Sequence, residues 1–423
     1  MYREINRELL DFLQKSPSCF HAVDYMKRVL SKQGFTELKE EKYWEIKPGG
    51  SYFVLRGDAA LIAFTIPQTG ISGWRIMTSH CDSPTFKIKE NPEITVESKY
   101  VQLNTEGYGG MIKSTWLDRP LSIAGRVMVR TTDGALSSKL VNIDRDLLLI
   151  PNASIHMNRE INKGYVYNNQ KDMLPLFGEM AAKDKFMSLI AEAAGILPEE
   201  ILSHDLFLYN RQAPSIWGAE EEFISAGKLD DLQCAFASLK GFLDGPKKDF
   251  AAVHCVYDNE EVGSASKQGA ASTFLKDTIN RITESLSMSR QEELMTIANS
   301  FMISADNAHA LHPNHTEMAD PVNRPVLNGG PVIKYSAEQK YCTDAVSAAM
   351  FKALCEKANV PYQTFTNRSD KPGGSTLGSI SNCQVALNSI DIGLPQLAMH
   401  SSYETAGAKD TAYLVEVAKV FFA

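Results

Sequence analysis

The sequence predicts an α/β protein: a mixed, mostly parallel sheet flanked by helices, with a strand-rich domain inserted in it. Strand-like and helical segments alternate toward both ends of the chain. The segment between them changes to short alternating runs. A length of 423 residues also exceeds one ordinary core. We therefore expect a discontinuous domain, 1–90 and 226–423, and an inserted domain, 91–225.

Two kinds of periodicity occupy the first 90 residues. Apolar residues at helical spacing predict one or two amphipathic helices within 4–35. Apolar runs then predict strands at 51–55, 60–66 and 74–78. The third strand leads into Ser79-His80-Cys-Asp82-Ser-Pro84, so an imidazole and a carboxylate follow a buried strand.

The middle segment has the pattern of an antiparallel sheet. The run 123–129 alternates apolar and small or polar residues, and Thr132-Asp-Gly134 is a turn signal. One helix is expected near 183–194.

The α/β alternation resumes after 226. In chain order we expect a helix after Asp230, a strand from 251 to Glu260, a helical run at 273–300, a strand at 301–304, a helix at 343–358, strands at 362–366 and 384–390, and a helix from about 408. Ligands in such sheets bind at the carboxyl ends of the strands.

Composition limits the classes of partner and compartment. A formal charge of −8 argues against nucleic acid as the main partner, because no basic excess neutralises phosphates. The seven cysteines form no CxxC pair and predict reduced thiols. The N-terminus lacks a signal-peptide core, and no apolar run approaches the ~20 residues of a membrane helix. We expect a soluble, cytoplasmic protein without a membrane partner.

Two adjacent carboxylates, Glu260 and Glu261, follow the apolar run 251–257 and precede Gly263. Neighbouring side chains at a strand end point in different directions. One carboxylate can bind a metal ion while the other acts as a general base toward a metal-activated water. This division of labour predicts metal-assisted hydrolysis.

Four other segments offer the remaining ligands: His80, Asp230, Asp306 and His400. Asp82 can accept the second N–H of the His80 imidazole, or it can cap the turn before Pro84. Asp230 can bridge two metal ions, or Asp230 or Asp231 can cap the following helix. Two imidazoles and three carboxylates suit zinc, with cobalt or manganese as alternatives.

Two other patterns carry less weight. His309, His312 and His315 are three residues apart, but Pro313 interrupts a helix there, so we favour a place in the active-site wall or a structural role. Gly373-Gly374 lacks the lysine of a phosphate loop and indicates a close-approach turn instead.

Taken together, five motifs resemble the aspartyl aminopeptidase family of dinuclear zinc metallopeptidases, in the family's order and over most of the chain. The motifs are Ser79-His80-Cys-Asp82-Ser-Pro84, Lys228-Leu-Asp230-Asp231, Asp258-Asn-Glu260-Glu261-Val-Gly263-Ser, Ser304-Ala-Asp306-Asn-Ala-His309-Ala-Leu-His312-Pro-Asn and Met399-His400-Ser-Ser-Tyr-Glu404. The resemblance implies a bacterial member of this family.

The resemblance also implies a role for each position. Asp230 would bridge two zinc ions, His80 and Asp306 would complete one site, and Glu261 and His400 would complete the other. Glu260 would be the general base, and Asp82 would orient His80.

For the fold and assembly, the resemblance implies a peptidase-like catalytic domain and an inserted dimerisation domain. It implies a dodecamer built from dimers, in which His156 reaches a neighbouring subunit's active site. Lys334 matches the region of the substrate side-chain contact and suits an acidic residue, although some bacterial relatives prefer other residues.

The predicted function is removal of single N-terminal residues, acidic ones (Asp or Glu) among them, from peptides by a dinuclear-metal-activated water with Glu260 as base. A carboxypeptidase or amide deacylase on the same fold is the alternative enzyme. A non-catalytic peptidase homologue acting as a scaffold is the alternative outside enzymes.

Overall fold

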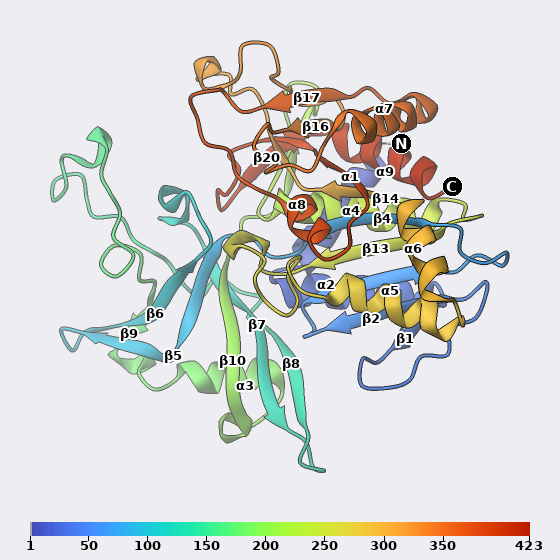
Figure 1. Cartoon of the computed structure of the whole chain (residues 1–423). Coiled ribbons are helices and arrows are strands. Elements are labelled where there is room, and N and C mark those ends of the chain that lie inside the picture. The colour runs from blue at the N-terminus through green and yellow to red at the C-terminus, as the bar shows by residue number, and fades with distance from the viewer. Residues whose placement is uncertain (1) are drawn as a thin grey trace.

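The computed structural model describes residues 2–423 and contains, within them, a nine-stranded, a six-stranded and a five-stranded sheet (Figure 1). The largest sheet has the order β1-β2-β3-β13-β4-β14-β18-β16-β17. Its strands are β1 (Thr36–Leu38), β2 (Ser51–Arg56), β3 (Ala60–Thr65), β4 (Trp74–His80), β13 (Ala251–Tyr257), β14 (Phe301–Ala305), β16 (Val332–Tyr335), β17 (Gln363–Thr366) and β18 (Asn388–Gly393). Five of its eight strand pairings are parallel, which confirms the predicted mixed, mostly parallel sheet.

Helices cover both faces of this sheet. One face packs against α1 (Tyr2–Lys15), α2 (Cys19–Lys32), α4 (Leu229–Asp244), α7 (Ala345–Ala358) and α9 (Asp410–Phe421). The other face packs against α5 (Phe274–Ser285), α8 (Leu377–Asn382) and the end of α6 (Arg290–Ala298). Strand β3 serves both cores, since Leu61 and Ala63 join the first and Ile62 and Phe64 the second.

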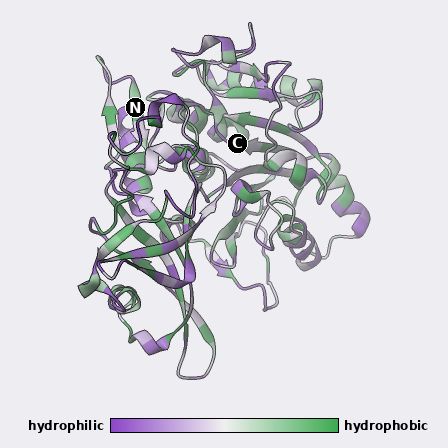
Figure 2. Ribbon diagram, turned by 90° about the vertical axis from the view of Figure 1, so that its left-hand side faces the viewer, coloured by the Kyte–Doolittle hydropathy of each residue, from purple (hydrophilic) through white to green (hydrophobic). Residues whose placement is uncertain are grey.

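The six-stranded sheet is antiparallel throughout, with the order β8-β7-β10-β5-β6-β9. Its strands are β5 (Thr85–Val96), β6 (Tyr100–Tyr108), β7 (Leu121–Arg130), β8 (Leu136–Asn142), β9 (Leu176–Glu179) and β10 (Ile201–Asn210). Helix α3 (Phe186–Ala194) adds Phe186 and Ile190 to its core. Figure 2 shows these strands in mixed green and purple, as expected for a sheet with one apolar face.

The five-stranded sheet was not predicted. It joins β11 (Ser215–Trp217), β12 (Phe223–Ala226), β20 (Glu404–Gly407), β19 (Pro395–Leu397) and β15 (Ala308–His309). These strands are two to four residues long, too short for a hydrophobic period to show in the sequence. The sheet brings the chain before Asp230 next to the chain after His400.

Two expected boundaries were wrong. The run 273–300 is two helices, because Ser287 adopts a positive φ of 58° and Ser289 caps α6 by accepting from the Glu292 N–H. The strand expected at 384–390 begins at Asn388, because the backbone from Cys383 to Val385 continues the turns of α8.

Two further expectations, reduced cysteines and no membrane helix, concern the compartment of the protein. All seven cysteines are free thiols. Among residues 2–423, no helix is long and apolar enough to cross a membrane.

Candidate active site

Three adjacent parallel strands place most of the predicted site residues at one edge of the large sheet. Strands β13, β4 and β14 are neighbours and run in the same direction. His80 ends β4, Glu260 and Glu261 follow β13, and Asp306 follows β14. The carboxyl ends of parallel strands meet at one edge, so residues more than 200 positions apart converge there.

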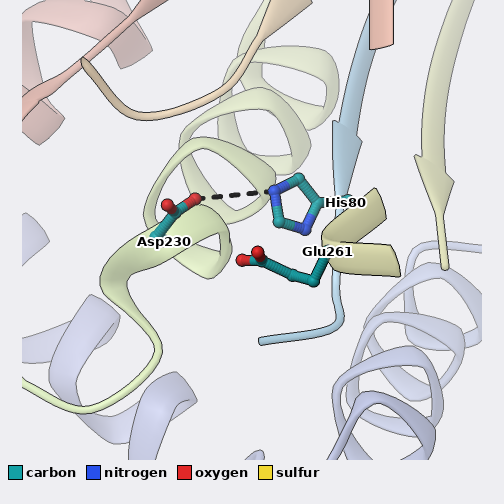
Figure 3. A group of neighbouring side chains, drawn as sticks. All are labelled: His80, Asp230 and Glu261. Carbon is teal, nitrogen blue, oxygen red and sulfur yellow. Dashed lines mark ion pairs between the residues drawn. The ribbon is translucent and has the colours of Figure 1, made fainter. Parts of the chain in front are cut away.

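Asp230 lies between the two predicted imidazole ligands. Its Oδ1 is 3.5 Å from His80 Nε2, and its Oδ2 is 3.4 Å from His400 Nε2. Figure 3 shows Asp230 facing His80, with Glu261 beside the pair. Each oxygen of one carboxylate therefore faces a different imidazole, which is the arrangement a bridging ligand requires.

Each imidazole has a second carboxylate near its Nε2. His80 Nε2 is 3.8 Å from Asp306 Oδ1, and His400 Nε2 is 3.3 Å from Glu261 Oε2. Two donors of one tetrahedral zinc ion lie roughly 3.3 Å apart, given bond lengths of about 2.0–2.1 Å. The separations suit one ion on each side of Asp230.

Grouping the possible ligand atoms only by their distances from one another gives two different sets. It joins His80 with Asp230 and Glu261, and His80 with Asp231 and Asp306, each within 4.8 Å. Asp231 accepts the backbone N–H of His80 at 3.1 Å, and burial raises the pKa of its carboxyl well above the usual range. We take Asp231 as a support for His80, because its Oδ2 already serves as the acceptor for the His80 backbone.

Charge and burial fit a cation at this place. Within residues 2–423, Asp230 Oδ1 and Glu261 Oε1 are buried and have no hydrogen-bond partner. Burial, followed by the charge of Asp230, raises the pKa of Glu261 well above its usual range. The pKa of His80 is raised as well, since the surrounding carboxylates outweigh its burial. Crowded carboxylates of this kind are stabilised by divalent ions, so the residues fit the implied zinc.

The Nδ1 atom of each imidazole faces an acceptor oxygen. His80 Nδ1 lies 3.1 Å from the backbone oxygen of Asp82 and 3.3 Å from its Oδ1. His400 Nδ1 lies 2.6 Å from the carbonyl oxygen of Gly110. Both Nε2 atoms are thereby directed at Asp230. The neighbouring Gly109 has a φ of 73°, and a Cβ there would lie 3.1 Å from the Cβ of Glu261.

Asp82 is also the acceptor for three other groups. The backbone N–H groups of Glu260 and Glu261 donate to it at 3.1 Å, and the Tyr108 hydroxyl donates at 2.7 Å. Asn259 in turn donates to the Tyr108 oxygen at 2.8 Å. Sequence reasoning missed Tyr108, because nothing in the pattern of β6 distinguishes it from other strand residues.

Glu404 was quoted in a motif without a role. Its carboxylate accepts the backbone N–H of Asp230 at 3.0 Å and that of His400 at 2.8 Å. Burial raises its pKa to about 8. Glu404 thus ties together the two chain segments that flank the Asp230–His400 pair.

A cavity of about 210 Å³ opens on the site. Its lining includes Glu260, His309 and Lys334. Burial raises the pKa of Glu260 to about 7. Lys334 is buried, and its Nζ lies 3.3 Å from Asp306 Oδ2. Burial opposes its charge, but Asp306 and the other acidic groups around it together outweigh burial and raise the pKa of Lys334.

The other predicted residues lie either on the exposed surface or in the wall of the site cavity. His156 is exposed in the segment between the β8 and β9 strands, which projects as a blue-green loop in Figure 1. His312 and His315 are exposed, with ring centres 4.9 Å apart, and no helix holds them. His309 lines the site cavity, as does Gly374 of the glycine turn.

Imidazoles and carboxylates around a shared aspartate, with a free carboxylate beside them, define a metal-dependent hydrolase. The comparisons with known proteins agree. Residues 12–422 match the family model described as Aminopeptidase I zinc metalloprotease (M18). The chain is 47% identical over 422 residues to a probable M18 family aminopeptidase 2 of Clostridium novyi, covering 98% of both chains.

Solved structures agree in fold. One, described as the Ape4 and Nbr1 complex, has a TM-score of 0.95 and 34% identity, covering 100% of this chain and 86% of that one. Another, described as the S. cerevesiae mApe1 dodecamer, has a TM-score of 0.87 and 26% identity, covering 100% and 97%. The chain belongs to the M18 family of zinc aminopeptidases, which are hydrolases acting on peptide bonds.

Proposed function

We propose that this chain removes single N-terminal residues from peptides with two zinc ions per subunit. His80, Asp230 and Asp306 hold one ion, and Asp230, Glu261 and His400 hold the other. The single observation that carries this proposal is the placement of the two Asp230 oxygens, 3.5 and 3.4 Å from two different imidazoles. Cobalt or manganese would suit the same donors.

The bound ions would supply Lewis-acid polarisation of the scissile carbonyl and a water of lowered pKa. Glu260 lines the cavity but is not needed as a ligand in either triad. Its carboxylate takes the proton from the attacking water and delivers it to the leaving amine. Asp82 holds His80 through its Nδ1 and holds the backbone of Glu260, so it positions a ligand and the base together.

Substrate selection would involve the cavity wall. The Lys334 ammonium at the cavity suits an acidic N-terminal side chain. His156, supplied by a neighbouring subunit, would donate a hydrogen bond to the oxyanion. The exposed apolar side chains beside it, Ile155, Met157 and Val166, support a subunit contact in this segment.

We further propose that 1–90 and 226–423 form the catalytic domain and that 91–225 is a dimerisation domain, in a cytoplasmic dodecamer built from dimers. A similar structure is described as a dodecamer. The free thiols support a reducing compartment. Alanine at His156 should abolish most activity in the assembled protein, and a stable monomer with full activity would contradict the shared site.

A dipeptide panel tests the function. Wild-type and Glu260→Gln protein are assayed on free and N-acetylated dipeptides with zinc, cobalt or manganese. We expect cleavage of the free peptides alone, and a fall of about 10²–10⁴-fold in kcat in the variant at unchanged metal content. Cleavage of acetylated peptides would indicate a deacylase or carboxypeptidase instead. Comparing N-terminal Asp, Glu and Leu in wild type and Lys334→Met tests the acidic preference.

A further inference from the structure

We propose that the cavity between the six-stranded and nine-stranded sheets binds a free α-amino acid as a zwitterion. This cavity measures about 240 Å³ and shares none of its lining, among residues 2–423, with the metal-site cavity. Strands β5, β6, β7 and β10 line one side, and the start of α2 and the segments after β4 and β13 line the other. The inference goes beyond the proposed function; only the choice of probe rests on it.

The cavity holds one ammonium group that the described residues leave without an ion pair. Lys228 lines it, as does Glu404, whose oxygens already accept two backbone N–H groups. The other two cations of the lining are engaged. Lys87 lies 2.8 Å and Arg126 3.0 Å from the Asp205 carboxylate. Lys228 is therefore the cation available to a ligand carboxylate.

The first turn of α2 adds backbone N–H donors, which carry partial positive charge and so attract an anion as the Lys228 ammonium does. Ser18, Cys19 and Phe20 line the cavity. Ser18 precedes the helix but does not cap it, because its hydroxyl pairs with His21 Nδ1 at 2.8 Å. The first backbone N–H groups of a helix have no acceptor within the helix, and they favour an anion.

The opposite charge is offered by Asp258, which is only 3% exposed. Its Oδ2 accepts from Gln268 Nε2 at 3.3 Å, while its Oδ1 has no hydrogen-bond partner among the described residues. A buried carboxylate oxygen without a hydrogen-bond donor destabilises the folded protein. An ammonium donor from a ligand would remove that cost.

An apolar wall completes the site. Phe20 and Phe207 have ring centres 6.5 Å apart, and Trp116 lies in the same lining. A carboxylate for Lys228, an ammonium for Asp258 and an apolar body for the aromatic rings together describe an α-amino acid with a hydrophobic side chain. Free amino acids are also the general product class of an aminopeptidase.

Isothermal titration of the zinc-loaded enzyme with L-phenylalanine tests this site. Saturable binding is expected in wild type, and it should weaken at least about tenfold in Lys228→Met and in Asp258→Asn, the loss expected for one charge-assisted contact. Lys87→Met is the matched control, because that ammonium lines the same cavity but is already paired with Asp205. The affinity of the Lys87→Met protein for L-phenylalanine should match that of wild type.

Two analogues test each charge in the unaltered protein. N-acetyl-L-phenylalanine lacks the ammonium and should bind wild type and Asp258→Asn equally. L-phenylalaninamide lacks the carboxylate and should bind wild type and Lys228→Met equally. Both should bind wild type at least about tenfold more weakly than L-phenylalanine does.

Two results would overturn the proposal. One is a titration of the wild-type enzyme with L-phenylalanine that shows no saturable heat of binding. The other is L-phenylalanine binding of equal strength in wild type, Lys228→Met and Asp258→Asn, which would place the ligand at the metal site alone. Hydrolysis of free dipeptides is measured separately, so a failed activity would contradict the proposed function and leave the binding result standing.

Discussion

The two imidazoles of the site are built by different parts of the molecule. The His80 side chain is 1% exposed, lies on a central strand and is held by Asp82, two residues along the same chain segment. The His400 side chain is 32% exposed, lies in a loop with a φ of 65°, and is held by a carbonyl that follows β6 of the other sheet. One half of the site is therefore local to the large sheet, and the other half depends on how the two sheets pack.

This difference gives the six-stranded sheet a part in positioning the site. The segment after β6 contributes Gly110 to His400, while Tyr108 at the end of β6 contributes its hydroxyl to Asp82. Thr115, a few residues further on, holds Ser402 through both its hydroxyl and its carbonyl. If the halves differ as the structure indicates, substitutions should affect them to different degrees.

The largest effect is expected on the His80 side. Asp82→Asn keeps the size of the side chain and the backbone carbonyl oxygen 3.1 Å from His80 Nδ1. It loses the charge that lies 3.3 Å from that nitrogen and accepts from Tyr108 and the Glu260 backbone. Replacing such a partner of a metal ligand lowers metal affinity or activity about 10–100-fold. Zinc content and kcat are measured together. The exposed Asp133→Asn is the control, and an unchanged kcat in Asp82→Asn would contradict the role of Asp82.

Metal removal should separate the two halves next. Because His400 is more exposed than His80, a chelator should release the ion on the His400 side about tenfold faster, an order-of-magnitude expectation for a ligand near solvent. Zinc per chain is followed over time. His400→Ala should start near one zinc and show only the slow phase. Loss of both ions in one phase would contradict the predicted difference between the His80 and His400 sides.

How much of this site the sequence could predict follows from the same contrast. The ligands at strand ends, His80 and Asp306 among them, were found because a buried strand leaves a clear apolar run before a polar residue. In the structure His80 Nε2 lies 3.5 Å from Asp230 Oδ1 and 3.8 Å from Asp306 Oδ1. Their roles stay predictions until the experiments above are done.

The supporting residues could not be predicted. Tyr108, Gly110 and Glu404 act through contacts across the packed sheets, 26 to 290 residues from their partners, or through short strands with no period of their own. Local patterns carry no information about such contacts. The five-stranded sheet escaped prediction for the same reason.

A smaller effect is expected where the second sheet touches Asp82. Tyr108→Phe removes the hydroxyl that donates to Asp82 at 2.7 Å and accepts from Asn259. A net hydrogen bond contributes about 0.5–1.5 kcal/mol, and Asp82 keeps its two backbone donors, so kcat should fall about 2- to 12-fold while KM changes little. Tyr165→Phe removes an exposed hydroxyl that pairs with Asp172 and should change neither value. A Tyr108→Phe enzyme with wild-type kcat would show that the His80 half needs nothing from the second sheet.

The smallest effect is expected on the loop that carries His400. Thr115→Val keeps the shape of the side chain but leaves the Ser402 N–H, now 2.9 Å from the Thr115 hydroxyl, without that acceptor. Because the Thr115 carbonyl still accepts from the Ser402 hydroxyl, the loop loosens without detaching. A net hydrogen bond contributes about 0.5–1.5 kcal/mol, so the fast phase of zinc release should quicken a few-fold while the slow phase stays unchanged. Thr131→Val, in an exposed turn, is the control. If Thr115→Val quickened both phases equally, the two imidazoles would share one support, and the division between a local half and a packed half would be wrong.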